Sequence, residues 1–297
     1  LERARRFLDA ARQNGLKVLL EMGGMVDQTV NRQAIETHVQ AFKDHPALLA
    51  WYVRDEPSPA QQPVVREAAE LFRRLDPAHP TYMVSCRPSE FAAEAHLADI
   101  FAVDPYPLPG GAITTVAKWT DAARKATLDE RPVWLIPQAH DNTSYDRKPP
   151  ERGARPPTPE QERCMLYQCL IHGAKGIVWY TWDDRPNMGV KYHPAMQAVI
   201  RELCAEATAL APLLRDGSQR PFSAAEGKVH GLVCVAPEGR CLLVVNTVSA
   251  AVSAAFEVEE ALPGQVYTSL DGGARVTGQG KRLTLPLPAL AGQAYRF

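Results

Sequence analysis

The sequence predicts an α/β fold, a (β/α)8 barrel, followed by a small C-terminal antiparallel β-sandwich. The first observation is that amphipathic helical segments alternate with short apolar runs through residues 1–217, at spacings of roughly 20 to 45 residues that suit βα units. The second is that, from about residue 218, short strand-like segments alternate with Gly, Pro, Asn and Asp turns. We therefore expect two domains, residues 1–217 and 218–297.

Local signals mark the boundaries of several expected elements. Gly15 suits the left-handed turn after a helix, and Thr158 to Gln161 is typical of a capping box with Pro159 at the first helical position. The expected helices are 1–14, 32–43, 59–75, 89–97, 114–126, 159–172 and 193–214. The expected strands are 16–20, 48–53, 82–85, 100–103, 133–136 and 176–180, then 229–235, 241–245, 254–258, 265–269 and 282–287.

Composition and motifs exclude several classes of protein. The formal net charge of -1 argues against a nucleic-acid partner, and no apolar run approaches the roughly 18 residues of a membrane helix. The six cysteines lack C-x-x-C spacing, and no Gly-rich phosphate turn follows a strand, so we expect no metal and no other cofactor. The chain begins within a helical pattern without a signal sequence, so we expect its natural beginning upstream; an exported location and the oligomeric state stay open.

The segment from Leu48 to Pro57 is the strongest functional signal. Leu48 to Val53 predict a strand buried on both faces, and Pro57 cannot donate to a sheet, so the strand should end at Asp55 and Glu56. Two adjacent acids near the interior repel each other, which raises one pKa toward the range of a general acid. The alternative is that Asp55 is a turn or capping residue and Glu56 is merely solvated.

With Asp55, Glu56 and Pro57 at a strand end, the chain resembles the glycoside hydrolases built on the TIM barrel. In that group the fourth strand ends in Asn-Glu-Pro or Asp-Glu-Pro, and its Glu is the acid/base. The resemblance makes residues 15–20 the third strand with its approach and residues 173–182 the eighth, with two strands upstream of Leu1. It implies a glycosidase acting on an oligo- or polysaccharide, with Glu56 as general acid/base and Asp55 as its partner.

One position departs from that group. Its retaining members carry a nucleophilic Glu at the end of the seventh strand, where this chain has Gln138, and a neutral amide cannot form a glycosyl-enzyme ester. Three explanations compete: substrate assistance, in which Asp55 orients an acetamido group of the substrate; inversion, with Asp104, Asp183 or Asp184 activating water; and a non-catalytic carbohydrate-binding barrel. A TIM-barrel enzyme acting on another polar small molecule is a more distant alternative.

Sugar sites combine aromatic platforms with hydrogen-bonding groups, because a pyranose ring presents both C–H faces and hydroxyls. The candidate contacts at the strand ends are Asp104, Tyr106, Gln138, His140, Tyr180, Trp182 and Asp183. Trp182 is the favoured platform, whereas Trp51 and Trp134 lie within strands and should be packing residues. The long segment 142–158 is expected to form a lid or rim, with its basic residues solvated: Arg147, Lys148, Arg152 and Arg155.

Overall fold

The computed structural model of the chain describes residues 1–141, 155–184 and 188–297. Six strands follow one another in chain order in one sheet, and the first four pair in parallel. They are β1 (Val18–Glu21), β2 (Leu48–Asp55), β3 (Thr81–Ser85), β4 (Ile100–Val103), β5 (Val133–Leu135) and β6 (Gly176–Ile177). This order confirms the expected α/β class and is consistent with part of a (β/α)8 barrel.

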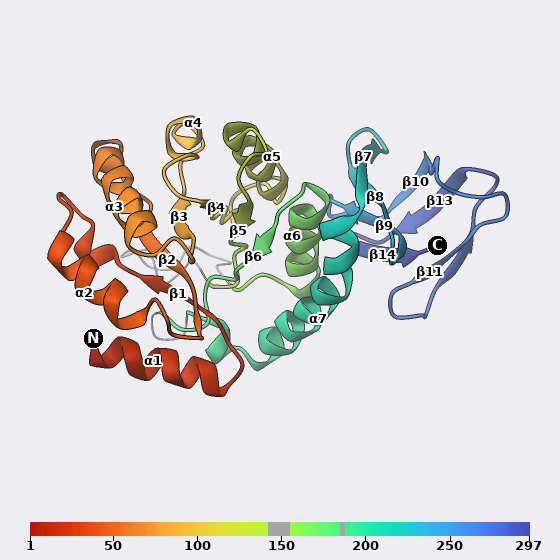
Figure 1. Cartoon of the computed structure of the whole chain (residues 1–297). Coiled ribbons are helices and arrows are strands. Elements are labelled where there is room, and N and C mark those ends of the chain that lie inside the picture. The colour runs from red at the N-terminus through yellow and green to blue at the C-terminus, as the bar shows by residue number, and fades with distance from the viewer. Residues whose placement is uncertain (142–154, 185–187) are drawn as a thin grey trace. The chain divides into compact units, whose positions relative to one another are not determined.

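A helix lies between each pair of consecutive strands, because parallel neighbours need a crossover connection. The helices are α1 (Glu2–Gln13), α2 (Arg32–Phe42), α3 (Gln62–Leu75), α4 (Phe91–Glu94), α5 (Thr115–Thr127), α6 (Pro159–Ile171) and α7 (Pro194–Asp216). In Figure 1, α2 and α3 lie side by side along the same side of the first strands. Trp51 of β2 is buried, stacks on Phe72 of α3 and donates to Asp76 over 2.9 Å, so it is a packing residue as predicted.

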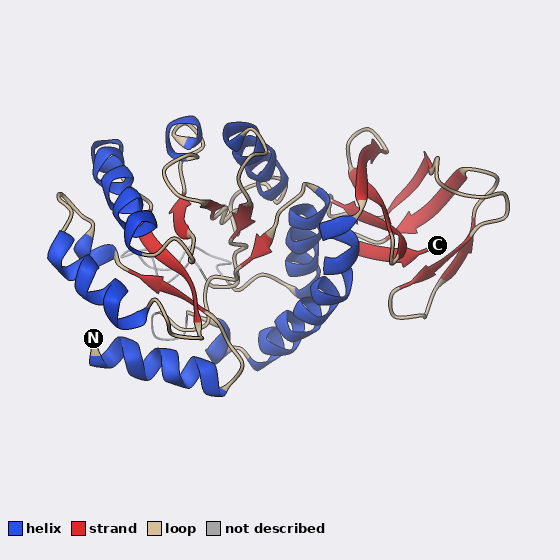
Figure 2. Ribbon diagram, viewed as in Figure 1, coloured by secondary structure: helices blue, strands red, loops and turns tan. Residues whose placement is uncertain are grey.

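After α7 the chain passes to antiparallel sheets, and residues 218–297 consist of strands and loops (Figure 2). The larger sheet has the order β12-β11-β14-β9-β8-β7, and β10 pairs with β13. These strands are β7 (Ser218–Ala224), β8 (Val229–Ala236), β9 (Gly239–Asn246), β10 (Val252–Glu257), β11 (Val266–Ser269), β12 (Arg275–Thr277), β13 (Arg282–Leu287) and β14 (Gly292–Arg296). A buried core containing Val244, Phe256 and Leu285 joins the two sheets.

Contacts divide the chain into two compact units, residues 1–104 with 121–134 and residues 105–120 with 135–297. The change from α7 to β7 falls at the predicted boundary of 217 and 218, but the contacts do not divide the chain there. In the second unit, one buried core joins α6 and α7 to β8, β9 and β14. A Cβ atom at Gly292 of β14 would lie 2.5 Å from the ring of Tyr167 in α6, so glycine permits this close packing.

Several predicted elements differ in extent, and three strands were not predicted. The strand expected at 176–180 is regular only over Gly176–Ile177. Beyond Ile177 the pairing is reduced to an isolated bridge between Tyr180 and Gln138. Pro59–Gln61 form a 3-10 turn before α3, and α4 spans only Phe91–Glu94 instead of 89–97. The strands β7, β12 and β14 lack a long apolar pattern; β7, for example, is exposed along most of its length.

Within the described residues, no helix has both the length and the apolar character needed to cross a membrane.

Glu162, in the first turn of α6, is a fully buried acid. Among the described residues, neither of its carboxyl oxygens has a well-formed hydrogen bond. Burial raises the pKa of Glu162 well above its ordinary value, and the nearby indole of Trp179 opposes this shift only in part. The carboxyl group is therefore protonated in the folded protein at pH values at which it ionises in the unfolded chain.

We expect Glu162→Gln to remove part of the pH dependence of stability. Because the folded protein keeps a proton that the unfolded chain releases above a pKa of about 4.3, the wild-type free energy of unfolding falls as the pH rises above that value. The amide side chain of the variant cannot ionise, so the variant should gain stability relative to the wild type between about pH 5 and about pH 8. Urea denaturation at both pH values measures the difference, and a difference that does not change with pH would contradict the expectation.

Candidate active site

Acidic side chains gather at the carboxyl ends of the strands in the first compact unit. Glu21 ends β1, Asp55 ends β2 and is followed by Glu56, and Asp104 follows β4. The register pairs Glu21 with Tyr52, Asp55 with Val84, and Ser85 with Val103, so these strands end at the same edge of the sheet. This is the edge at which (β/α) barrels carry their active sites.

The backbone turns sharply at Glu56. Its φ of +41° lies in the left-handed region, which costs a residue other than glycine about 1–3 kcal/mol. The amide of Glu56 donates to the carbonyl of Val84 over 3.0 Å, so the residue is tied to β3 at the point where β2 ends. Ser58, not Asp55, forms the capping box of the following helical turn, with Gln61 as its partner. Both Asp55 and Glu56 are exposed residues.

Tyr52 holds the carboxyl group of Asp55. The pairing of β2 with β3 skips one residue between Tyr52 and Arg54, and this bulge places Tyr52 and Asp55 on the same face although they are three residues apart. The hydroxyl of Tyr52 donates to Asp55 Oδ1 over 2.5 Å. Partial burial raises the pKa of Asp55, the hydrogen bond from Tyr52 opposes that shift, and the charges of Glu56 and Glu21 add to it.

Asp104 forms a buried acidic pair with Glu56. Asp104 is 5% exposed, and its Oδ1 has no hydrogen-bond partner among the described residues. Burial raises the pKa of Asp104 to about 9, reinforced by the hydrogen bond to Glu56 and by the negative charges of Glu56 and Asp55. The pair therefore holds a proton at neutral pH, and its exposed member is Glu56.

Cys86 supplies a second contact to Glu56. Burial raises the pKa of the Cys86 thiol to about 12, and the charge of Glu56 and its hydrogen bond with the thiol add to the shift. The thiol is therefore protonated and donates to the Glu56 carboxylate. Sequence reasoning did not select Tyr52, Cys86 or Glu21 as site residues, although Glu21 and Cys86 both stand at strand ends, which was the available signal.

The second compact unit brings together an aromatic group from the predicted sugar contacts. The ring of Tyr106 stacks on that of Tyr180 at 5.7 Å, and His140 meets both rings edge-on, at 4.8 Å from Tyr106 and 5.2 Å from Tyr180. His140 is fully buried, and its Nδ1 lies 2.9 Å from the carbonyl oxygen of Tyr180. The hydroxyl of Tyr180 donates to Asp184 over 2.6 Å. Tyr106 and Tyr180 are partly exposed, whereas His140 supports them from within.

Gln138 has a structural role in the folded chain. It is fully buried, its Oε1 accepts from the amide of Leu108 over 2.9 Å, and its Nε2 donates to the carbonyls of Leu108 and His140. Both ends of the side-chain amide are therefore occupied by backbone groups. Contact between Gln138 and a substrate stays a prediction, but in this conformation its side chain holds the loop that follows Asp104.

Trp182 and Asp183 follow Tyr180 and are both exposed. Trp182 is 60% exposed, which leaves its indole free to serve as the predicted platform. The carboxylate of Asp183 accepts hydrogen bonds from the ammonium group of Lys191 over 2.7 Å and from the hydroxyl of Tyr192 over 3.1 Å. The hydrogen bond from Lys191 lowers the pKa of Asp183, which is therefore an anion at neutral pH.

Most of the segment predicted as a lid lies outside the described residues, including Arg147, Lys148 and Arg152. Arg155 is described, and it contacts the carbonyl of Pro156 and the side chain of Gln161. The expected capping box of Thr158 and Gln161 at the start of α6 is confirmed. In the described part of the chain, no cluster of His, Cys, Asp and Glu side chains is arranged to hold a metal ion.

No protein-family model and no curated protein sequence matches this chain. Its fold is similar to solved structures of glycoside hydrolases. A family 5 glycoside hydrolase from Bacteroides vulgatus matches with a TM-score of 0.61 and 12% identity, over 92% of this chain and 66% of that protein. An Anoxybacillus α-amylase matches with a TM-score of 0.58 and 12% identity, over 89% of this chain and 62% of the amylase.

A family 30 endoxylanase from Clostridium papyrosolvens is also similar, with a TM-score of 0.55 and 14% identity over 91% of this chain and 70% of the enzyme. The chain therefore spans between 62% and 70% of the length of these three proteins. At such low identity the similarity establishes the fold, which agrees with the resemblance that the sequence suggested.

We expect Glu56→Gln to lower the pKa of Asp104. The variant removes the negative charge that disfavours ionisation of Asp104, so this carboxyl group should ionise well below its wild-type value of about 9. Carbon-13 NMR titration of the aspartate carboxyl groups measures the shift. Glu21→Gln is the control, because Glu21 is not among the groups that raise the pKa of Asp104. An unchanged Asp104 titration in Glu56→Gln would contradict the pairing.

We expect Tyr52→Phe to raise the pKa of Asp55. The lost hydrogen bond stabilises the Asp55 anion, so without it the carboxyl group stays protonated to a higher pH. The same NMR titration measures this change. Tyr82→Phe removes the hydroxyl of a neighbouring buried tyrosine that does not bond to Asp55, and the Asp55 titration should then keep its wild-type position.

Proposed function

We propose that the protein is a glycoside hydrolase that cleaves O-glycosidic bonds of an oligo- or polysaccharide, with Glu56 as its general acid/base. The observation that carries this proposal is the proton-holding pair of exposed Glu56 and buried Asp104 at the carboxyl edge of the sheet. We further propose that the parallel sheet is part of an eight-stranded barrel, and that the antiparallel sheets form a supporting sandwich.

In the proposed reaction, the proton that Asp104 holds passes to Glu56, which delivers it to the glycosidic oxygen as the bond from that oxygen to the anomeric carbon breaks. Glu56 is the member of the pair that a substrate can reach, since Asp104 is buried. The high pKa of Asp104 keeps one proton on the pair through neutral pH, so the pair is loaded before substrate binds. In the second step, Glu56 takes a proton from the attacking water.

Asp55 suits substrate assistance. In that route the acetamido oxygen of the substrate attacks the anomeric carbon, and Asp55 accepts a hydrogen bond from the acetamido N–H and orients it. The bond from Tyr52 stabilises the anionic form that this role requires and fixes the direction of the carboxyl group. The route needs no enzyme nucleophile, which agrees with the presence of Gln138 where a nucleophilic Glu was expected.

Inversion is the competing route, and it requires two carboxyl groups about 6.5–9.5 Å apart with a water between them. Asp104 fits this role poorly, because it touches Glu56 directly and is protonated at neutral pH. Asp183 is paired with Lys191, and Asp184 accepts a hydrogen bond from Tyr180. Glu21, whose charge acts on Asp55, is a further carboxylate for an inverting mechanism.

A panel of aryl glycosides that includes N-acetylhexosaminides tests the activity. We expect Glu56→Gln to lower kcat by about 10²- to 10⁴-fold, because general-acid catalysis contributes that much. Glu70→Gln, at an exposed position of α3, is the matched control and should retain the wild-type rate.

Product stereochemistry, followed by proton NMR, separates the routes. Retained configuration with activity restricted to acetamido sugars supports substrate assistance, and an inverted product excludes it. Glycan binding without release of reducing ends would overturn the enzyme proposal in favour of a carbohydrate-binding protein.

A further inference from the structure

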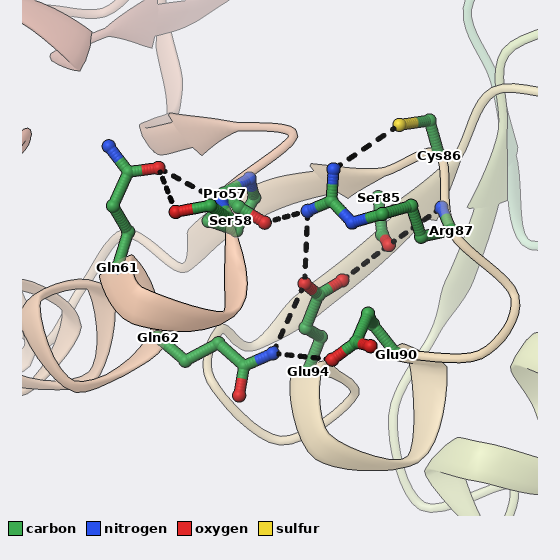
Figure 3. A network of polar contacts seen from close by, with 9 residues as sticks. All are labelled: Pro57, Ser58, Gln61, Gln62, Ser85, Cys86, Arg87, Glu90 and Glu94. Atoms are coloured by element: carbon green, nitrogen blue, oxygen red, sulfur yellow. Dashed lines mark hydrogen bonds and ion pairs between the residues drawn. The ribbon is translucent and has the colours of Figure 1, made fainter.

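Arg87 connects the end of β3 to the turn that carries Glu56. Its guanidinium donates to the carbonyl of Pro57, the residue directly after Glu56, and its Nη1 lies 3.8 Å from the sulfur of Cys86 (Figure 3). The same group forms an ion pair with Glu94 at 3.6 Å. Arg87 thus contacts the backbone after Glu56 and the thiol that donates to the Glu56 carboxylate.

Glu94, at the end of α4, anchors Arg87 from within the protein. Its side chain is 0% exposed, and it accepts hydrogen bonds from the hydroxyl of Ser85 and from Gln62 at 3.4 Å. Burial raises the pKa of Glu94, and the hydrogen bond from Ser85, the charge of Arg87 and the hydrogen bond from Gln62 oppose this shift. A buried carboxylate is costly unless it is paired and hydrogen-bonded, so these partners account for a charge at this position.

The turn at Glu56 needs such support. A residue with φ of +41° is held in its conformation by its surroundings, and here β3 and the loop that follows it supply the contacts. The Val84 carbonyl accepts from the Glu56 amide, and Arg87 holds the Pro57 carbonyl. A shift of about 1 Å in a reacting group costs roughly 10²-fold in rate, so these contacts bear on the chemistry as well as on folding.

We propose that Arg87, anchored by Glu94, is a positioning residue that fixes the Glu56 turn in its reactive geometry. This inference rests on the proposed role of Glu56 as the acid/base. Arg87 does not touch the substrate in this scheme. It acts through the Pro57 carbonyl and Cys86, so its loss should reduce turnover with little effect on the affinity for substrate.

Arg87→Met and Glu94→Gln test the proposal. Arg73→Met is the matched control: Arg73 has the same 34% side-chain exposure as Arg87 and pairs with Asp99 at 2.9 Å, next to the start of β4. We expect Arg87→Met to lower kcat by about 10- to 100-fold with KM within about twofold, and Glu94→Gln to have a smaller effect of the same kind. Arg73→Met should leave both constants at wild-type values.

Arg87→Lys provides a milder variant should Arg87→Met fold poorly. A lysine keeps the charge beside Glu94, but its single ammonium group lacks the planar fork with which Arg87 spans Glu94 and the Pro57 carbonyl. Its kcat should lie between those of the wild type and Arg87→Met. A wild-type kcat in a folded Arg87→Met, or a rise in KM alone, would overturn the proposal.

Amide hydrogen exchange separates this inference from the proposed function. The Glu56 amide is protected by its bond to Val84, so its exchange should quicken about tenfold or more in Arg87→Met and stay unchanged in Arg73→Met. A wild-type protein without any glycosidase activity would refute the proposed function, yet the exchange would still show whether Arg87 holds the turn. Equal exchange in the two variants would refute the positioning role.

Discussion

Parallel pairing of β2, β3 and β4 sets the spacing between the side chains at their carboxyl ends, and this spacing brings Glu56 against Asp104. Ionisation of both carboxyl groups would place two adjacent negative charges at a site where Asp104 is buried, so the pair of Glu56 and Asp104 retains a proton. The neighbouring groups are hydrogen-bond donors to this edge. The Cys86 thiol donates to Glu56, and the Tyr52 hydroxyl donates to Asp55. The chemistry proposed for this edge depends on that division between a protonated pair and a single anion.

The strained turn shows how the same edge is kept in place. Glu56 occupies a left-handed conformation; β3 accepts a hydrogen bond from its amide, and Arg87 in the loop after β3 donates to the carbonyl of Pro57. The buried carboxylate of Glu94 also supports this turn, although it does not contact the turn itself. It pairs with the Arg87 guanidinium, which donates to the carbonyl of Pro57. Local strain and a buried ion pair are both unfavourable in isolation, and here they are coupled.

The sequence was sufficient for features that depend on neighbouring residues. The end of β2 at Asp55, the capping box at Thr158 and the packing role of Trp51 follow from local patterns, and the structure agrees with them. The contacts that decide the chemistry are different in kind. Asp104 meets Glu56 only through strand register, and Tyr52 faces Asp55 only because a bulge interrupts the alternation of β2, which a pattern of period two cannot reveal.

The helix α6 has a consequence for how this protein can change over evolutionary time. Its buried face shares one core with β8, β9 and β14, and Tyr167 sits against Gly292 with no room for another side chain. Exchanging the antiparallel sheets for an unrelated module would therefore expose the apolar side chains that α6 buries against them. A substitution at this contact on one side of Gly217 therefore limits which side chains fit on the other side.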